Sequence, residues 1–106
     1  MYTCPCCGYS GLEAKPYKNM PSLAATKDQP IPYEDIWGMG SYEVCSCCGY
    51  EFGFEDNPGL GPGETFEPAR AAWISDGCNW FEPSDMPSGW SADEQLRAAG
   101  LRSTLI

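Results

Sequence analysis

The sequence predicts a small α+β fold in which zinc-ribbon-like β-hairpins are joined by a Cys4 zinc site, with one or two short C-terminal helices. Three observations support this fold class. A cysteine motif occurs twice, at 4–9 and 45–50, alternating apolar and acidic residues surround its second copy, and helix-capping patterns follow. The length of 106 residues suits one small domain, so we expect a single domain over 1–106.

The segment between the two motifs, 14–41, is expected to be an ordered, loop-rich insert. Its apolar residues show no sustained period, and its prolines interrupt any helix. These prolines are Pro16, Pro21, Pro30 and Pro32. The chain as a whole has 12 Gly and 10 Pro among 106 residues, which also indicates that loops occupy much of it.

The second motif lies within the clearest strand signal of the chain. Tyr42 and Val44 are separated by an acidic residue before the motif, and the alternation resumes at 50–54. A period of two is typical of a half-buried strand, so we expect a hairpin here. Pro-Gly and Gly-Pro pairs within 57–63 then predict a turn-rich link.

Two short helices are predicted after this link. Thr65 suits the N-cap of a helix within 65–77, which Gly77 would end. Ser91 begins a capping-box pattern that predicts a second helix within 91–100. The residues expected on the inner faces of these helices are Phe66, Ala69, Trp73, Ile74, Leu96 and Ala99.

The cysteines at the outer positions of each motif have the spacing of metal ligands. A Cys-x-x-Cys turn can direct two sulfurs at one point, and two such turns complete the tetrahedral shell that Zn²⁺ prefers. The predicted ligands of one structural zinc ion are Cys4, Cys7, Cys45 and Cys48. Closing the long intervening loop costs only about 0.6 kcal/mol per doubling of its length, whereas structural zinc contributes on the order of 10–16 kcal/mol.

Three further cysteines are open to several interpretations. Cys6 and Cys47 stand beside the predicted ligands and could pack, replace a ligand or help to hold a second metal ion. A catalytic dithiol is less favoured. Redox dithiols usually stand at the N-terminus of a helix, whereas glycine and strand-like residues follow both motifs here. Cys78 is expected to be a small buried side chain.

The charge balance restricts the classes of partner. Fifteen acidic and six basic residues give a net charge of −9, and the six are scattered. We therefore expect a protein partner, for which a basic protein is the natural candidate, and no nucleic acid. Neither a signal peptide nor an apolar run of transmembrane length is present, which predicts a cytoplasmic protein without a membrane partner.

Catalysis finds little support in the composition. The chain contains no histidine, which removes the usual base for a nucleophile and the usual ligand of a catalytic zinc ion. The acidic pairs Glu34-Asp35 and Glu55-Asp56 are expected to be solvated surface charge. We therefore expect a protein that is not an enzyme.

The four tryptophans could pack in the core or form a stacking platform for a ligand. A loop-rich small domain needs its large aromatic side chains for burial, which favours the core. Of the four, Trp37 and Trp90 are the candidates for exposure, while Trp73 and Trp80 are expected inside.

Three stretches together resemble the bacterial cysteine-rich CPCC family, whose members are small zinc-ribbon-like proteins of undefined role. They are Cys4-Pro-Cys-Cys7-Gly8-Tyr9, Tyr42-Glu-Val-Cys45-Ser-Cys-Cys48-Gly49-Tyr50-Glu-Phe-Gly and Arg70-Ala-Ala-Trp73-Ile-Ser-Asp-Gly77-Cys-Asn-Trp80-Phe81. The resemblance implies the metal site but no function. Ser46, where the family often has proline, and the insert over 14–41 depart from the pattern.

Two functional hypotheses follow from these features. The first is a cytoplasmic zinc-binding protein with a structural Cys4 site that acts on a protein partner through an acidic surface, for example as an inhibitor or immunity-type protein. The second is a thiol-based handler of metal or redox equivalents that uses the clustered cysteines as exchangeable ligands. Cys6 and Cys47 motivate the second.

Overall fold

A computed structural model describes residues 1–101 of the chain. Within them lie three α-helices and two short 3₁₀ helices. The α-helices are α1 (Glu34–Trp37), α2 (Phe66–Ser75) and α3 (Ala92–Ala98), and the 3₁₀ helices are η1 (Leu23–Thr26) and η2 (Pro83–Asp85). None of the helices in this range has the length and apolar character that crossing a bilayer requires.

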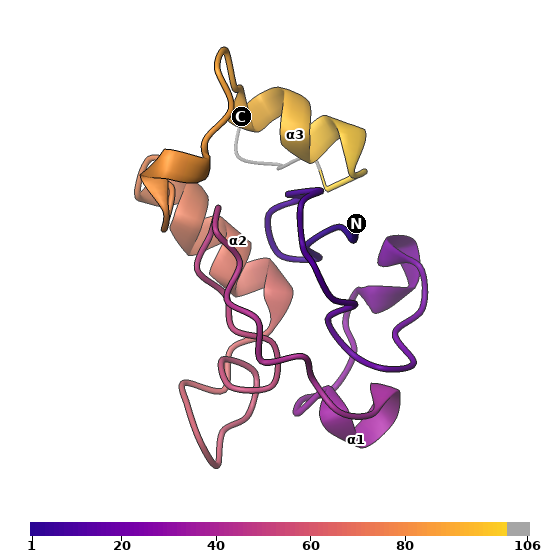
Figure 1. The fold of residues 1–106 in the computed structure, drawn as a ribbon. Coiled ribbons are helices and arrows are strands. Elements are labelled where there is room, and N and C mark those ends of the chain that lie inside the picture. The colour runs from indigo at the N-terminus through magenta and orange to yellow at the C-terminus, as the bar shows by residue number, and fades with distance from the viewer. Residues whose placement is uncertain (102–106) are drawn as a thin grey trace.

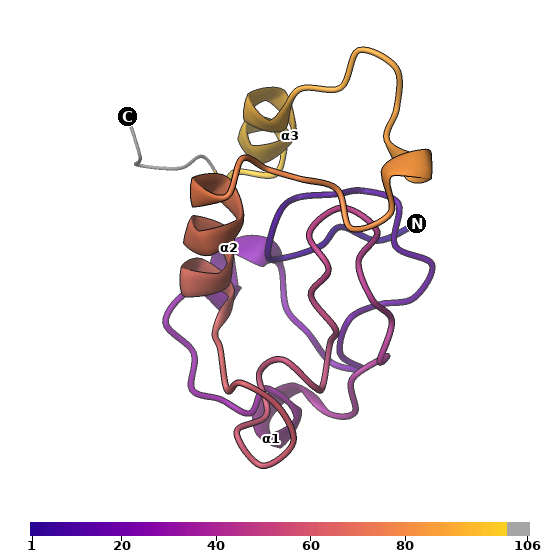
Figure 2. The ribbon, with the colours of Figure 1, turned by 90° about the vertical axis from the view of Figure 1, so that its left-hand side faces the viewer.

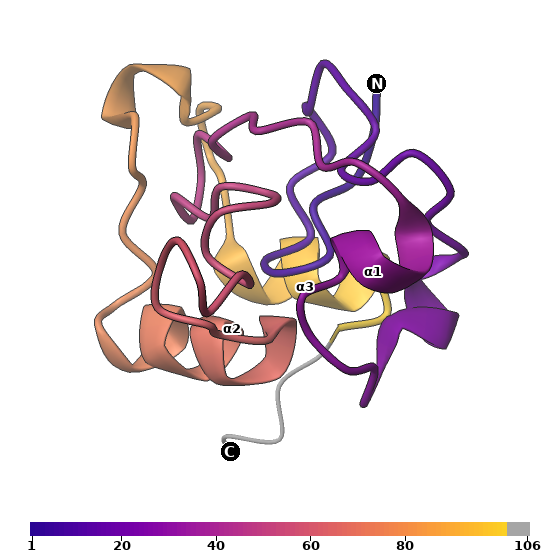
Figure 3. The ribbon, with the colours of Figure 1, turned by 90° about the horizontal axis from the view of Figure 1, so that it is seen from below.

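The helices lie around a centre built from the two cysteine turns. Figures 1 and 2 place α3 and α1 at opposite ends of the molecule, with residues 1–13 and 42–54 between them. In Figure 3, which views the molecule from below, α2 and α1 lie on opposite sides. The cysteine turns are therefore enclosed by segments that come from the whole length of the chain.

The zinc-ribbon-like hairpins expected from the sequence are reduced to single bridges. Tyr2 pairs with Leu12 around the first cysteine turn, and Val44 pairs with Glu51 around the second, both antiparallel. Residues 1–101 contain no regular strand. After the second bridge the N–H groups of Phe54 and Glu55 both donate to Glu51 O, at 3.1 and 3.0 Å, so the chain coils into a turn where a ladder would continue.

Helix α2 lies within the range 65–77 expected for it. Thr65 occupies the N-cap position, but its side chain makes no capping hydrogen bond. The hydroxyl of Tyr33 instead accepts a hydrogen bond from Phe66 N at 3.2 Å, which satisfies one of the free N–H groups of the first turn. Gly77, at φ +101°, adopts the left-handed conformation that follows a helix end.

Helix α3 lies within the expected range 91–100. The Ser91 hydroxyl accepts a hydrogen bond from Glu94 N at 3.3 Å, which is one half of the predicted capping box. Leu96 is buried on the inner face of the helix, as expected from the sequence. On the outer face, Arg97 forms an ion pair with Asp93 one turn earlier.

The insert over 14–41 is more than a loop, because it supplies three of the eight buried aromatic side chains within residues 1–101. Tyr33 stacks between two rings, with its centroid 4.7 Å from that of Trp37 and 4.4 Å from that of Phe66. Tyr17 packs edge-on against Tyr33 at 5.6 Å. Trp37 is only 6% exposed, so it belongs to the core that the sequence favoured for the tryptophans and is not an exposed exception. Aromatic residues that show no periodicity in the sequence can still pack together in the core, because tertiary contacts bring distant positions together.

A buried carboxylate connects the insert to the second cysteine turn. Asp56 is fully buried, and its Oδ1 accepts hydrogen bonds from the Tyr17 hydroxyl at 2.6 Å and from Gly53 N at 3.0 Å. Its Oδ2 accepts from Tyr33 N at 2.8 Å. This residue is therefore a structural acceptor for three donors rather than the solvated charge expected from the sequence.

Replacement of this carboxylate tests its structural role. Asp56→Ala leaves three buried donors without an acceptor, so we expect the free energy of unfolding to fall by about 3 kcal/mol or more. Denaturant unfolding in the presence of Zn²⁺ measures the change. Asp35→Ala, at an exposed position of α1, is the control and should change stability by less than about 0.5 kcal/mol. Equal effects of the two substitutions would contradict this role.

Candidate metal centre

The four cysteines predicted as ligands converge on one point. Their sulfur atoms all lie within 4.8 Å of one another. Cys4 Sγ lies 3.8 Å from Cys48 Sγ, and Cys7 Sγ lies 3.7 Å from Cys45 Sγ. A tetrahedral ion with Zn–S bonds of about 2.3 Å has sulfurs about 3.8 Å apart, so these separations fit a Cys4 site for a metal ion.

The two cysteine turns that form this site have the same backbone geometry. Gly8 N donates to Cys4 O and Gly49 N donates to Cys45 O, each at 2.8 Å. The two glycines have φ values of +88° and +83°, a conformation that side-chain-bearing residues rarely adopt. A Cβ atom at Gly8 would also lie 3.0 Å from the Ala99 side chain. The repeated Cys-Cys-Gly sequence is thus explained by a repeated turn.

The surroundings of the clustered thiols shift their pKa values in different directions. Burial raises the pKa values of the Cys4 and Cys7 thiols well above their usual range. Hydrogen bonds from Cys4, Cys48 and Cys7 lower the pKa of Cys45. A divalent ion would favour the thiolate form of all four sulfurs and release protons on binding.

Cys6 and Cys47 lie outside the group of four sulfurs and contact the two C-terminal helices. The Cys6 thiol donates to Phe66 O, at the first residue of α2, over 3.9 Å. Cys47 Sγ accepts from Gln95 Nε2 on α3 at 3.4 Å. Each of these two buried cysteines therefore joins its turn to a different helix. Cys78 is half-buried at φ +56°.

Two polar side chains from the helices hold the first cysteine turn in place. Arg70 on α2 donates through Nε to Cys6 O at 2.6 Å and through Nη2 to Pro5 O at 3.0 Å. Gln95 on α3 donates through Nε2 to Cys7 O at 3.1 Å. Neither contact can be predicted from the sequence, because a long-range hydrogen bond to a backbone carbonyl leaves no pattern there.

At the second cysteine turn, backbone N–H groups donate the hydrogen bonds to the carbonyl groups of the turn. Phe81 N donates to Cys47 O at 3.0 Å, and Glu82 N donates to Ser46 O at 2.8 Å. The segment between α2 and η2 thus lies along this turn as a short paired strand would. The hydrogen bond from Glu82 uses only the backbone carbonyl of Ser46, so a serine is compatible with the turn at this position.

Comparisons with known proteins identify relatives without an established role. The chain is 26% identical over 97 residues to the uncharacterized protein YozI of Bacillus subtilis strain 168, an alignment that covers 82% of this chain and 68% of that protein. It is 27% identical over 97 residues to the uncharacterized protein YoaQ of the same organism, covering 81% and 68% of the two chains. No family model and no solved structure matches the chain.

Serine substitutions separate the ligands from their neighbours. Loss of any of the four ligand sulfurs should abolish stoichiometric zinc binding and cooperative folding, because the remaining three cannot close the shell. The four substitutions are Cys4→Ser, Cys7→Ser, Cys45→Ser and Cys48→Ser. Cys6→Ser and Cys47→Ser should keep one zinc ion, since a hydroxyl can make the same hydrogen bonds. Metal analysis and circular dichroism measure both outcomes, and zinc loss in either of the last two variants would contradict the assignment.

Removal of the guanidinium group tests the contact between α2 and the first cysteine turn. Arg70→Met keeps most of the aliphatic stem but leaves two carbonyl groups without their donor, so we expect a loss of about 2 kcal/mol in unfolding free energy. Thermal or denaturant unfolding of the zinc-loaded protein gives the value. Arg97→Met removes an exposed ion pair as the control and should cost less than about 1 kcal/mol.

Proposed function

We propose that this chain is a non-enzymatic cytoplasmic protein with one structural Zn²⁺ ion, and that it acts on a basic protein partner through its acidic surface. The observation that carries the proposal is the group of four sulfurs within 4.8 Å of one another. Zinc is the metal proposed because a closed tetrathiolate shell suits it, and such shells are typical of structural sites. The ligands are Cys4, Cys7, Cys45 and Cys48.

The proposal extends to the family and the fold of the chain. We also propose that the chain belongs to the bacterial cysteine-rich CPCC family and forms one zinc-ribbon-like domain over 1–106. The repeated glycine-terminated turns support this placement, since a shared knuckle can persist where its flanking strands are short. An inhibitor or immunity-type role is the concrete version of the proposal, because the net charge of −9 suits masking of a basic surface. Nucleic acid and membranes are not proposed as partners.

A thiol-based metal or redox handler is the second candidate. Its support is the half-exposed position of Cys48, since the other three proposed ligands are fully buried. Cys6 stands directly before the proposed ligand Cys7 in the same turn, which makes it the candidate for ligand exchange. The enclosed position of Cys4, Cys7 and Cys45 favours the structural role.

Native mass spectrometry combined with affinity purification tests the proposed function. We expect one zinc ion per chain, seven reduced cysteines and recovery of a specific basic protein at low salt that is lost as salt is raised. A second ion, copper or a metal-free disulfide form would support the handler instead. A reversed-charge bait of similar size is the control for non-specific capture, and absence of a specific basic protein would count against the proposed partner.

A further inference from the structure

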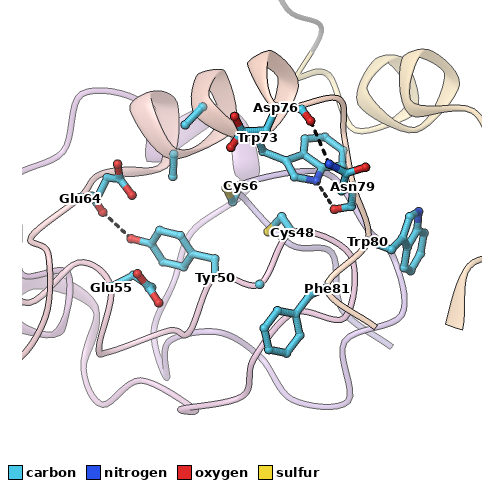
Figure 4. Close-up of a pocket in the computed structure, with 13 residues that line it drawn as sticks. Cys6, Cys48, Tyr50, Glu55, Glu64, Trp73, Asp76, Asn79, Trp80 and Phe81 are labelled. Carbon is cyan, nitrogen blue, oxygen red and sulfur yellow. Dashed lines mark hydrogen bonds between the residues drawn. The ribbon is translucent and has the colours of Figure 1, made fainter. Parts of the chain in front are cut away.

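A pocket of about 380 Å³ opens beside the candidate metal centre. Figure 4 shows Glu55 and Glu64 at one end of this pocket and Asp76 at the other, with the sulfur of Cys48 between them. The volume lies near the lower end of the range for ligand pockets. The pocket therefore has room for one long side chain or a small molecule.

Aromatic rings form much of the wall. Tyr50, Trp73 and Trp80 are buried and line the pocket, while Phe81 is 60% exposed at its edge. The Tyr50 hydroxyl donates to Glu64 O at 2.6 Å, which holds one ring beside the acidic end. Flat aromatic faces next to carboxylates are a favourable environment for a cation with an apolar stem.

The carboxylates of the pocket have no cation of their own. The side chains of Glu55 and Glu64 make no hydrogen bond or ion pair with another residue in 1–101, and no basic residue lines the pocket. Glu64 N donates to Glu55 O at 2.8 Å, so the two residues are adjacent on paired backbone. Burial and the neighbouring Glu64 raise the pKa of Glu55, which an incoming positive charge would reverse.

The floor of the pocket adds further negative charge. Cys48 is the half-exposed member of the four proposed zinc ligands, and it lines the pocket together with Cys6. Four thiolates around one Zn²⁺ ion carry a net charge of about −2. Within residues 1–101, Cys48 Sγ has sulfur neighbours but receives no hydrogen bond from an N–H group, so it remains available as an acceptor.

We propose that this pocket binds an arginine side chain of the protein partner, with the guanidinium group between the Glu55 and Glu64 carboxylates and the stem against the aromatic wall. Arginine fits better than lysine, because a planar guanidinium group is weakly hydrated, stacks on aromatic rings and bonds to two carboxylate oxygens at once. The inference rests on the proposed function and names the place on the acidic surface where the partner is recognised.

A defined peptide tests the pocket without knowledge of the partner. The isotope-labelled, zinc-loaded full chain is titrated with acetyl-Gly-Arg-Gly-amide, and the indole N–H signals of Trp73 and Trp80 are followed by NMR. We expect saturable shifts of these signals, weaker binding of the lysine peptide and no shift with the uncharged citrulline peptide. Absence of saturable binding of the arginine peptide would overturn the proposal.

Matched double variants locate the binding site. Glu55→Gln/Glu64→Gln should weaken peptide binding at least about tenfold, because both charged acceptors are lost. Glu13→Gln/Asp35→Asn removes the same net charge from exposed positions that do not line the pocket and should change affinity less than about twofold. Zinc content and circular dichroism verify that both variants fold.

The results for the two double variants test the binding pocket separately from the proposed function. Equal weakening by the two double variants would assign binding to the overall charge, which overturns the pocket and leaves the acidic-surface function intact. Selective weakening by the pocket variant supports the pocket. The affinity purification described above decides the partner independently, since it uses the whole surface of the unmodified protein.

Discussion

The convergence of four sulfur atoms is the constraint on which the rest of this structure depends. The cysteine turns are separated by a long insert and have only one bridging residue pair each, so hydrogen bonding between strands cannot hold them together. Burial and mutual contact also disfavour simultaneous ionisation of the thiols. A bound divalent ion would resolve both difficulties, because it would neutralise the thiolates and join the two turns at one point.

Helices α2 and α3 both form hydrogen bonds to the cysteine turns. Helix α2 reaches the first turn through Arg70, and helix α3 reaches both turns through Gln95, which touches Cys7 O and Cys47 Sγ. Hydrogen bonds to carbonyl groups hold the turns from outside, and an ion bound by the four sulfurs would hold them from inside. This arrangement explains how a domain with little regular structure can keep a defined site.

A second, metal-independent centre lies in the insert. Tyr33 combines three roles, since its ring stacks between Trp37 and Phe66, its N–H donates to Asp56, and its hydroxyl accepts from the first N–H of α2. The insert therefore positions α2, and α2 in turn forms one wall of the acidic pocket. The insert and the first cysteine turn therefore both contact the first residue of α2.

The sequence by itself determined the four candidate ligands and the approximate positions of α2 and α3, because these features depend on local spacing, glycine turns and capping residues. Tertiary structure decided the rest. The expected hairpins became single bridges, Trp37 became buried, and Asp56 became a shared acceptor. Each of these outcomes depends on contacts between residues far apart in the chain, and local patterns carry no information about such contacts.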